Sequence, residues 1–297
     1  MKAHSNFRGF FFAVTAGICW GVSGTFVQFL LHTRGLNIEW LVSVRLLVAG
    51  SILLLLAAAK KDTSLTAIWH DRRNATSLLT FSLLGMLAVQ YTFFSAIKYT
   101  NAATATILQF LGPVIIAGYL AIRQRRMPDL RQLLAIGLAV AGTFLLVTHG
   151  SFDTISISGE GLLWGIASAV TLAFYSLQPA ALFKKFNMAT IVGYSMVIGG
   201  IALSIGSHPW EVPGTWDLPT YLCTAFIFIP GTLVAFYIYL IAIKNIGAQT
   251  PSLLVSVEPV SAALLSVFWL GVPFGWTDLL GTAFILATIF LLTKGRE

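Results

Sequence analysis

Apolar segments of about 20 residues recur along the whole chain, and short polar loops separate them. A segment of this length crosses a bilayer as an α-helix, because a helix rises about 1.5 Å per residue and the hydrocarbon core is about 30 Å thick. Only 10% of the 297 residues are charged, against about 25% in soluble domains. The sequence therefore predicts an all-α membrane protein of ten transmembrane helices, over residues 10–31, 39–59, 76–97, 102–122, 131–148, 160–183, 189–206, 219–243, 250–271 and 276–293.

Two stretches of the chain, 96–146 and 242–292, align without a gap at an offset of 146 residues. Both begin with Ala-Ile-Lys, and the matched positions include Thr104/Thr250, Pro113/Pro259 and Ala117/Ala263. A matched Lys, Thr and Pro in fixed register indicates an internal duplication. Each copy then holds five spans, an odd number, so the copies must have opposite orientations in the membrane. We expect two inverted five-helix repeats, 1–148 and 149–297.

Basic residues gather on one side of the predicted membrane. The side that holds the N-terminus carries fifteen Lys and Arg, whereas the other side carries only Arg34 and Lys98. By the positive-inside rule, both termini should be cytoplasmic. The formal net charge of +7 is then explained by the membrane surface, and we expect no nucleic-acid partner.

Several function classes are disfavoured by what the sequence contains. Cys19 and Cys223 both lie in apolar segments, so we expect neither a disulfide nor a metal site. No Gly-x-x-x-x-Gly-Lys-Ser/Thr phosphate loop occurs, which argues against a nucleotide-driven pump. The first apolar segment is long and lacks an Ala-x-Ala-like exit, so we do not expect it to be a cleaved signal peptide.

A set of loose motifs in fixed order gives the chain a family resemblance. Trp20-Gly21 lies in span 1, Arg45 lies in "SVRLLVAG" of span 2, and the stretches leading into and through spans 4 and 9 read "AIKYTNAATATILQFLGPV" and "AIKNIGAQTPSLLVSVEPV". On these motifs the chain resembles the drug/metabolite transporter superfamily, EamA type, over nearly its whole length. The resemblance implies a ten-helix transporter of small metabolites in the bacterial cytoplasmic (inner) membrane. Many members end spans 4 and 9 with Gly-Glu; here the sequence reads "RQRRM" and Gly271-Val272-Pro273, so no role passes to those carboxylates.

Glu258 is the only acidic residue well inside a predicted span, about 8 residues or about 12 Å past the cytoplasmic end of span 9. A carboxylate at this depth is costly and usually faces a cavity or a partner. One interpretation is a site for proton coupling or for a cationic substrate group. The other is a hydrogen bond within the bundle to a hydroxyl or to a backbone carbonyl that Pro259 frees.

Arg45 is the only basic residue inside a span, roughly 8 Å from the outer face. It would either contact a substrate anion or play a structural role, by extending to the interface or binding carbonyls of neighbouring helices, and the structural role is favoured. Arg45 and Glu258 lie near opposite faces, about 10 Å apart along the membrane normal. We therefore expect no direct salt bridge between them.

Polar and aromatic residues in the spans should turn inward, because lipid satisfies no donor or acceptor. Span 6 carries a stripe at helical spacing, which either lines a cavity or packs against neighbours: Trp164, Ser168, Thr171, Tyr175 and Gln178. Gln90 and Gln109 would bind either a ligand or each other. We expect a central pocket between the copies, lined by spans 1, 3, 4, 6, 8 and 9, with spans 5 and 10 at the periphery. Eight residues are predicted to contribute, at least five of them to one pocket: Trp20, Gln90, Tyr91, Gln109, Tyr175, Gln178, Tyr237 and Glu258.

These features favour a secondary active transporter. The resemblance implies that it works by alternating access, driven by protons or by exchange, and that it exports its substrate. One buried carboxylate among many aromatics favours an amino acid or amine over a nucleotide sugar, whose phosphates require several basic residues. The alternatives are a passive channel or facilitator and a membrane-embedded enzyme; the enzyme would need a second acid, His or metal cluster near Glu258. We expect no catalytic residue, no cofactor and no metal. The expected partners are a small-molecule substrate and the lipid bilayer, with the chain a monomer or homodimer.

Overall fold

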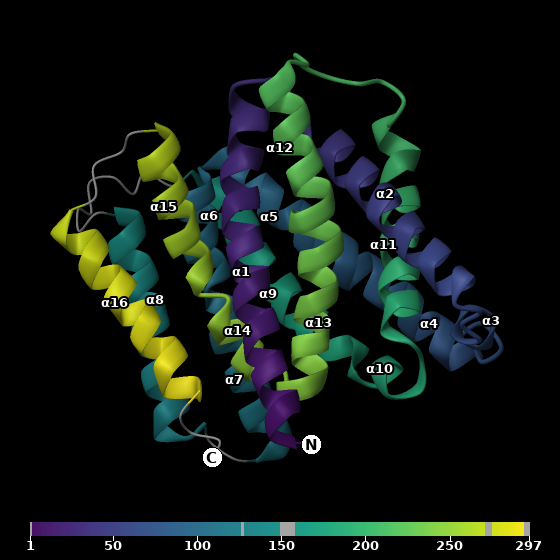
Figure 1. Cartoon of the computed structure of the whole chain (residues 1–297), viewed down its shortest axis with the longest axis horizontal. Coiled ribbons are helices and arrows are strands. Elements are labelled where there is room, and N and C mark those ends of the chain that lie inside the picture. The colour runs from purple at the N-terminus through teal and green to yellow at the C-terminus, as the bar shows by residue number, and fades with distance from the viewer. Residues whose placement is uncertain (1, 126–127, 149–157, 271–274, 294–297) are drawn as a thin grey trace.

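The computed structural model describes residues 2–125, 128–148, 158–270 and 275–293, and every regular element in these ranges is a helix (Figure 1). Seven helices among them are long and apolar enough to cross a membrane, judged by length and composition. They cover Phe7–His32, Ile38–Ala59, Arg72–Tyr99, Thr104–Gln124, Gly159–Lys185, Met188–Ser207 and Leu218–Ile246. A shorter apolar helix covers Leu130–Leu145. The predicted all-helical membrane class is confirmed for the described residues.

Each of the ten predicted segments coincides with one helix or with consecutive helices. The first five are α1 (Lys2–His32), α2 (Ile38–Ala59), α4–η1–α5 (Arg72–Thr80, Phe81–Leu87, Ala88–Tyr99), α6–α7 (Ala102–Gln109, Leu111–Gln124) and α8 (Leu130–Thr148). The others are α9 (Gly159–Leu177), α11 (Met188–Ser207), α12–η4–α13 (Leu218–Phe228, Ile229–Val234, Ala235–Ile246), α14–α15 (Gln249–Leu254, Val257–Leu270) and α16 (Trp276–Thr293). The predicted segment 160–183 also takes in two short helices that follow α9, η3 (Gln178–Ala180) and the start of α10 (Leu182–Lys185), and one short helix lies between segments, α3 (Ser64–Ala67). Arg126, Asp153, Lys294 and Arg296 of the charge count, and Gly271-Val272-Pro273, lie outside the described residues.

Polar N-caps start the helices where the sequence turns from polar to apolar. Asn37 accepts a hydrogen bond from the Trp40 N–H at 2.7 Å, and Asn101 accepts one from the Thr104 N–H at 2.7 Å. Side-chain caps of the same kind occur at Ser158, Asn187 and Asp217. An N-cap satisfies a backbone donor that the first helical turn leaves unpaired, so these residues fix where the apolar segments begin.

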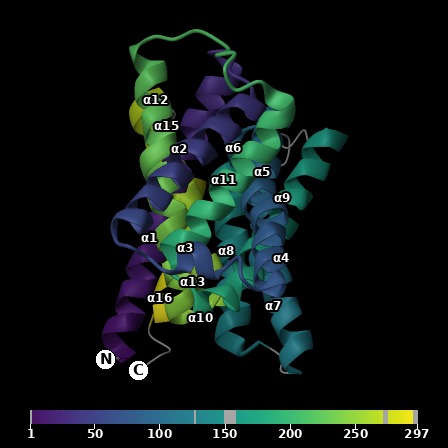
Figure 2. The same ribbon diagram turned by 90° about the vertical axis from the view of Figure 1, so that its right-hand side faces the viewer.

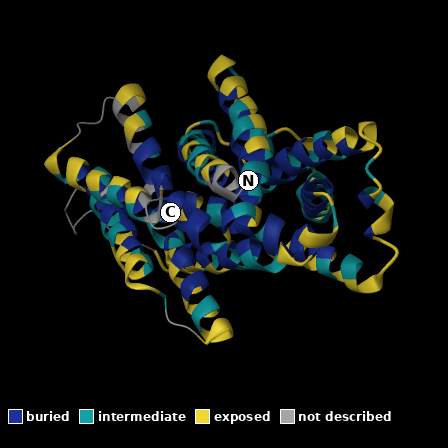
Figure 3. Ribbon diagram, turned by 60° about the horizontal axis from the view of Figure 1, so that its bottom comes forward, coloured by how far each residue is buried: buried dark blue, intermediate teal, exposed yellow. Residues whose placement is uncertain are grey.

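Helices far apart in sequence pack side by side. α2 packs against α11 and α8 against α16, and the two pairs form opposite edges of the bundle (Figures 1 and 2). Between them, α5, α6 and α7 pack against α9, whereas α1 packs against α13, α14 and α15. Figure 3 shows that buried residues face the inside of this arrangement and that exposed residues cover its outer faces. α8 and α16, the predicted spans 5 and 10, lie at the periphery as expected.

Four helical segments are interrupted at positions that the 146-residue offset relates. η1 and η4 are π-helical, and the offset places Gly85 of η1 on Gly231 of η4. Pro230 lies in η4 and cannot donate a backbone hydrogen bond. The same offset relates the break at Phe110, between α6 and α7, to the break at Ser256, between α14 and α15. π-helical turns and broken helices are often found at functional sites.

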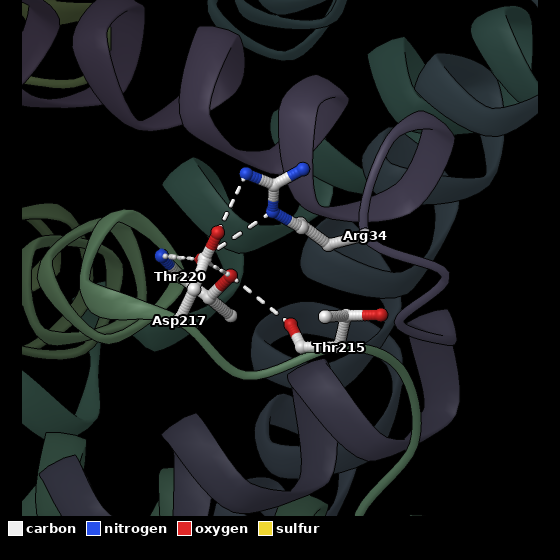
Figure 4. A network of polar contacts seen from close by, with 4 residues as sticks. All are labelled: Arg34, Thr215, Asp217 and Thr220. Carbon is white, nitrogen blue, oxygen red and sulfur yellow. Dashed lines mark hydrogen bonds and ion pairs between the residues drawn. The ribbon is translucent and has the colours of Figure 1, made fainter.

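A network of polar contacts joins the loop after α1 to the loop before α12 (Figure 4). Arg34 donates to Asp217 at 2.7 Å, and the Thr220 hydroxyl donates to the same carboxylate at 2.6 Å. The Thr215 N–H also donates to the backbone carbonyl of Arg34 at 2.9 Å. The hydroxyl and N–H of Thr220, together with Arg34, hold the pKa of Asp217 below its ordinary value. The carboxylate therefore stays charged and holds the two loops together.

Candidate functional site

A cavity opens between helices of the two predicted copies, with about 450 Å³ of space between its atoms, including its mouth. Its polar lining consists of Trp20, Ser23, Arg45, Gln90, Gln109 and Glu258. Its apolar lining consists mainly of Val89, Phe93, Phe94, Leu172 and Phe236, with Gly24 and Gly231 beside them. The lining comes from α1, α2, α5, α6, α9, η4, α13 and α15 (Figure 1). A small molecule held here would touch both copies.

Glu258 lies in the first turn of α15, directly after the break that separates α14 from α15. The sequence predicts one continuous helix over 250–271, with Glu258 inside it. Because of the break, Glu258 lies instead near the start of a helix. At the start of a helix the free N–H groups and the helix dipole favour a carboxylate. Pro259 follows in the same turn, where a missing N–H costs no helical hydrogen bond. The broken helix thus gives Glu258 a more favourable position than mid-helix.

Glu258 is only 4% exposed, and its one side-chain hydrogen bond among the described residues joins it to the Thr106 hydroxyl of α6 at 3.5 Å. The same hydroxyl donates to the Ala102 carbonyl at 2.8 Å. Because a hydroxyl carries one proton, the nearer carbonyl is the better acceptor, and the Glu258 carboxylate gains little from Thr106. A protonated Glu258 would instead donate to the Thr106 oxygen. The bundle hydrogen bond that the sequence allows is present, but it is long.

Gly21 brings α1 close to this break. A Cβ atom built on Gly21 would collide with the backbone carbonyl of Glu258 and would lie 2.9 Å from the Cβ of Ser261. Glycine is thus required for this contact. Its neighbour Trp20 lines the cavity. The Trp-Gly pair of span 1 therefore places an aromatic side chain in the cavity and allows α1 to approach Glu258.

Arg45 is 2% exposed and lines the same cavity. Its guanidinium lies 3.9 Å from the centre of the Phe94 ring, a cation–π contact. Its Nε atom is buried without a hydrogen-bond partner, and among the described residues no acidic oxygen lies within 4.0 Å of it. The expected absence of an Arg45–Glu258 salt bridge holds. Although the sequence places Arg45 and Glu258 near opposite faces of the membrane, both side chains line the same cavity.

Trp20 stands among aromatic rings at the centre of the lining. Its ring centre is 4.9 Å from that of Phe236 in an edge-on contact and 5.0 Å from that of Tyr239. Its indole N–H is buried without a partner. Edge-on packing holds the indole in place, and the unpaired donor is available to an acceptor in the cavity.

Gln90 and Gln109 both line the cavity, and no hydrogen bond joins them among the described residues. The Gln90 amide nitrogen lies 3.3 Å from the Met86 sulfur, a weak acceptor. Its amide oxygen is buried without a partner. The mutual pairing that we considered from the sequence does not occur, and Gln90 keeps an acceptor free.

Tyr175 and Gln178, which share the span 6 stripe, lie outside the lining. Tyr175 is fully buried, and its hydroxyl donates to the Phe236 carbonyl at 3.3 Å. The Gln178 amide donates to the carbonyl and hydroxyl of Ser77 at 3.0 and 3.1 Å. Higher on the stripe, the Thr171 hydroxyl lies 3.0 Å from that of Thr92. The stripe serves helix packing.

Tyr91 and Tyr237 also lie outside the lining. The Tyr91 hydroxyl donates to Glu39 at 3.1 Å, and its ring packs edge-on against Trp164. Tyr237 is half-buried on α13 and packs beside the core. Four of the eight predicted residues therefore border the cavity, Trp20, Gln90, Gln109 and Glu258, and the expected five are not reached. The Tyr91 and Tyr175 hydroxyls and the Gln178 amide nitrogen donate to neighbouring helices, whereas the Gln178 amide oxygen is buried without a partner.

The lining also includes residues that the sequence-based selection missed. Phe93 and Phe94 follow Gln90 at helical spacings of three and four, so periodicity could have placed them on its face. Leu172 and Phe236 carry no such signal, because apolar residues in a span face lipid, core or cavity alike. Among the described residues, no group of three or more His, Cys, Asp or Glu is placed to hold a metal ion.

Comparison with known proteins gives the family. The model of the EamA-like transporter family matches residues 7–148 and again residues 159–294. The chain belongs to the EamA-like transporter family. The two matches lie on either side of the boundary predicted between the two copies, and the family is one of membrane transporters.

Two relatives agree with this family assignment, and one solved structure shares the fold. The chain is 38% identical, over 97% of its length and 96% of the relative's, to the uncharacterized inner membrane transporter YicL of Salmonella typhimurium. It is 27% identical to the uncharacterized transporter YwfM of Bacillus subtilis, over 95% and 92% of the two chains. A crystal structure with 18% identity superimposes with a TM-score of 0.78, covering 99% of this chain and 97% of the other. That structure shares the fold.

Proposed function

We propose that this EamA-like protein is a secondary active transporter of a small metabolite such as an amino acid or an amine. The observation that carries the proposal is the cavity between the copies, which holds a buried carboxylate beside a helix break. Secondary transporters commonly bind substrate at the interface of their repeats, next to discontinuous helices.

The proposed architecture has ten membrane crossings in two inverted repeats, 1–148 and 149–297, related by a two-fold axis in the membrane plane. Such an axis exchanges span 3 with 8, span 4 with 9 and span 6 with 1. A packing of spans 3 and 4 on span 6 then requires an equivalent packing of spans 8 and 9 on span 1. The contacts of α5, α6 and α7 with α9, and of α13, α14 and α15 with α1, have this pattern. The matched interruptions support the same relationship.

The proposed location is the bacterial cytoplasmic membrane, with both termini in the cytoplasm. The start of α1 and the end of α16 lie at the same end of the bundle, as an even number of crossings requires (Figure 1). The excess of Lys and Arg on that side favours the cytoplasm by the positive-inside rule. Export is favoured over import only through the family resemblance.

Alternating access would use the interrupted helices. η1 and η4 lie at equivalent places in the two copies, and Gly231 of η4 lines the cavity. A π-helical turn adapts its backbone hydrogen bonds at lower cost than a regular α-helix, so these segments are suited to bend as the cavity changes the side to which it opens. Coupling is proposed to be exchange or proton movement through Glu258.

Counterflow in proteoliposomes tests the function. Vesicles loaded with an unlabelled amino acid or amine should accumulate the labelled compound transiently above its outside concentration. A passive channel equilibrates the label without this overshoot. Lack of an overshoot for every amino acid and amine tested, with protein that is folded and inserted, would refute the proposal.

A further inference from the structure

We infer that the cavity binds zwitterions: an α-amino acid whose carboxylate lies at Arg45 and whose ammonium lies at Glu258, with an apolar side chain between the aromatic residues. This inference deepens the proposed function and rests on it. The observation behind it is that two buried side chains of opposite charge line one cavity and do not pair with each other.

Arg45 supplies the anion-binding end. An arginine that is 2% exposed carries its charge in a medium of low dielectric, and such a charge is costly without an anion beside it. The Phe94 ring offsets part of this cost, but it leaves the N–H groups of the guanidinium edge for another acceptor. The planar fork of N–H groups matches a carboxylate with two parallel hydrogen bonds. A bound carboxylate would satisfy both the charge and the donors.

Glu258 supplies the opposite end. Its long contact with Thr106 leaves most of its acceptor capacity unused. An ammonium offers three donors and a compensating charge, which a buried carboxylate needs. Since the carboxylate and the Arg45 guanidinium are more than 4.0 Å apart, a molecule with separate charges is needed to reach both.

Neutral groups of the lining also fit an amino acid. The Trp20 indole N–H and the Gln90 amide oxygen are buried without partners, so the lining offers one free donor and one free acceptor. Ser23 and Gln109 are the other polar residues of the lining, and Phe93, Leu172 and Phe236 make up much of its apolar surface. An apolar side chain gains from this burial, whereas a second charge on the substrate would find no partner.

Simpler ligands satisfy the cavity less well. An amine reaches Glu258 but leaves Arg45 without an anion, and a carboxylic acid reaches Arg45 but leaves Glu258 without a cation. Each loses one charge-assisted hydrogen-bonded contact, which is expected to weaken binding about 10- to 100-fold. The inference therefore predicts a preference that depends on both charged groups of the ligand.

The first experiment measures binding to the purified wild-type protein in nanodiscs. The probes are L-leucine and L-phenylalanine, each with its decarboxylated amine and its deaminated acid, and the readout is the dissociation constant by calorimetry. The amino acid should bind about 10- to 100-fold more tightly than either analogue. Equal affinity for an amino acid and its amine would overturn the role of Arg45. Equal affinity for an amino acid and its acid would overturn the role of Glu258.

The second experiment assigns the two ends with variants. Arg45→Gln should weaken amino-acid binding about 10- to 100-fold and leave amine binding unchanged, whereas Glu258→Gln should leave binding of the acid unchanged. Arg123→Gln is the matched control, because Arg123 is exposed and its one hydrogen bond among the described residues is to Tyr119. If Arg45→Gln does not fold, Arg45→Lys keeps the charge without the fork and should still reduce affinity. A folded Arg45→Gln protein with wild-type affinity for the amino acid would overturn the inference.

Counterflow keeps the two proposals distinguishable. Overshoot with amines alone, together with equal binding of amine and amino acid, would leave the transporter proposal intact and refute the zwitterion site. Tight, charge-dependent binding of amino acids without overshoot for any compound would refute transport and support the site.

Discussion

The hydroxyl of Thr106 in α6 lies 3.5 Å from a carboxylate oxygen of Glu258 in α15, and this contact joins the two copies beside their matching helix breaks. It is the only side-chain hydrogen bond of Glu258 among the described residues and is too long to hold a charge strongly. The proposed coupling through Glu258 requires such a weakly held carboxyl group, which can change partners.

Glu258→Gln should abolish the response of transport to a pH gradient. Glutamine keeps the size and the hydrogen-bonding reach of the side chain but cannot bind or release a proton. At saturating substrate, uptake driven by a pH gradient should fall by about tenfold or more, and exchange without a gradient should persist. Uptake of labelled substrate into proteoliposomes, with and without an imposed gradient, measures both.

Glu160→Gln is the matched control for this change, because Glu160 is exposed at the start of α9. It should transport as the wild type does under both conditions. An unchanged gradient response in Glu258→Gln would reduce the carboxylate to substrate binding or packing.

Gly231→Ala should slow transport and destabilise the protein. A Cβ at this position would lie 2.7 Å from the Ser23 hydroxyl oxygen and 2.9 Å from the Ser23 Cβ, so η4 and α1 would have to separate. Overpacking of this kind costs about 1–3 kcal/mol. Gly137→Ala is the control, since no atom lies within 4 Å of an added Cβ there, and it should be neutral or slightly stabilising. Thermal unfolding and initial transport rates report the two effects; wild-type behaviour of Gly231→Ala would refute the close-packing argument.

The sequence predicted the helical segments well because a segment in lipid must be apolar and long, and because caps such as Asn37 and Asn101 mark the starts. It did not predict the break before Glu258. A helix that is interrupted for two residues keeps the same apolar pattern, so hydropathy cannot distinguish it from a continuous one. The repeat that aligns Pro113 with Pro259 relates the two breaks but does not locate them.

For the site, the sequence showed which side chains must leave lipid but not which partner each would meet. Tyr91, Tyr175 and Gln178 found acceptors in Glu39, Phe236 and Ser77, which lie 52, 61 and 101 residues away along the chain. Only the packing of the helices decides whether such a partner is within reach. Arg45 and Glu258 were recognised from charge alone, and the cavity that they share follows from the same packing.

Gln178→Ala should reduce stability without changing substrate affinity. It removes two hydrogen bonds to Ser77 of α4 and lies outside the cavity lining, so about 1–3 kcal/mol of stability should be lost. Gln90→Ala, inside the lining, should instead weaken binding. Unfolding temperature and dissociation constant, measured on both variants, separate the roles. A large loss of substrate affinity in Gln178→Ala would mean that Gln178 does contribute to substrate binding.

Asp217→Asn should lower the unfolding temperature at neutral pH, and the difference from wild type should shrink in acid. Hydrogen bonds from Thr220 and the Arg34 guanidinium hold the pKa of Asp217 below its ordinary value of 3.8 in the folded protein. A lowered folded-state pKa stabilises the fold above the unfolded value and loses that effect as the pH falls through the folded one. The gap between the two proteins should therefore be full at pH 7 and should close progressively below about pH 4. Thermal unfolding in detergent across this range measures it, with Asp71→Asn, which caps the exposed start of α4, as a control far from Arg34. A gap that does not change with pH would mean that geometry, not the charge of Asp217, ties the two loops together.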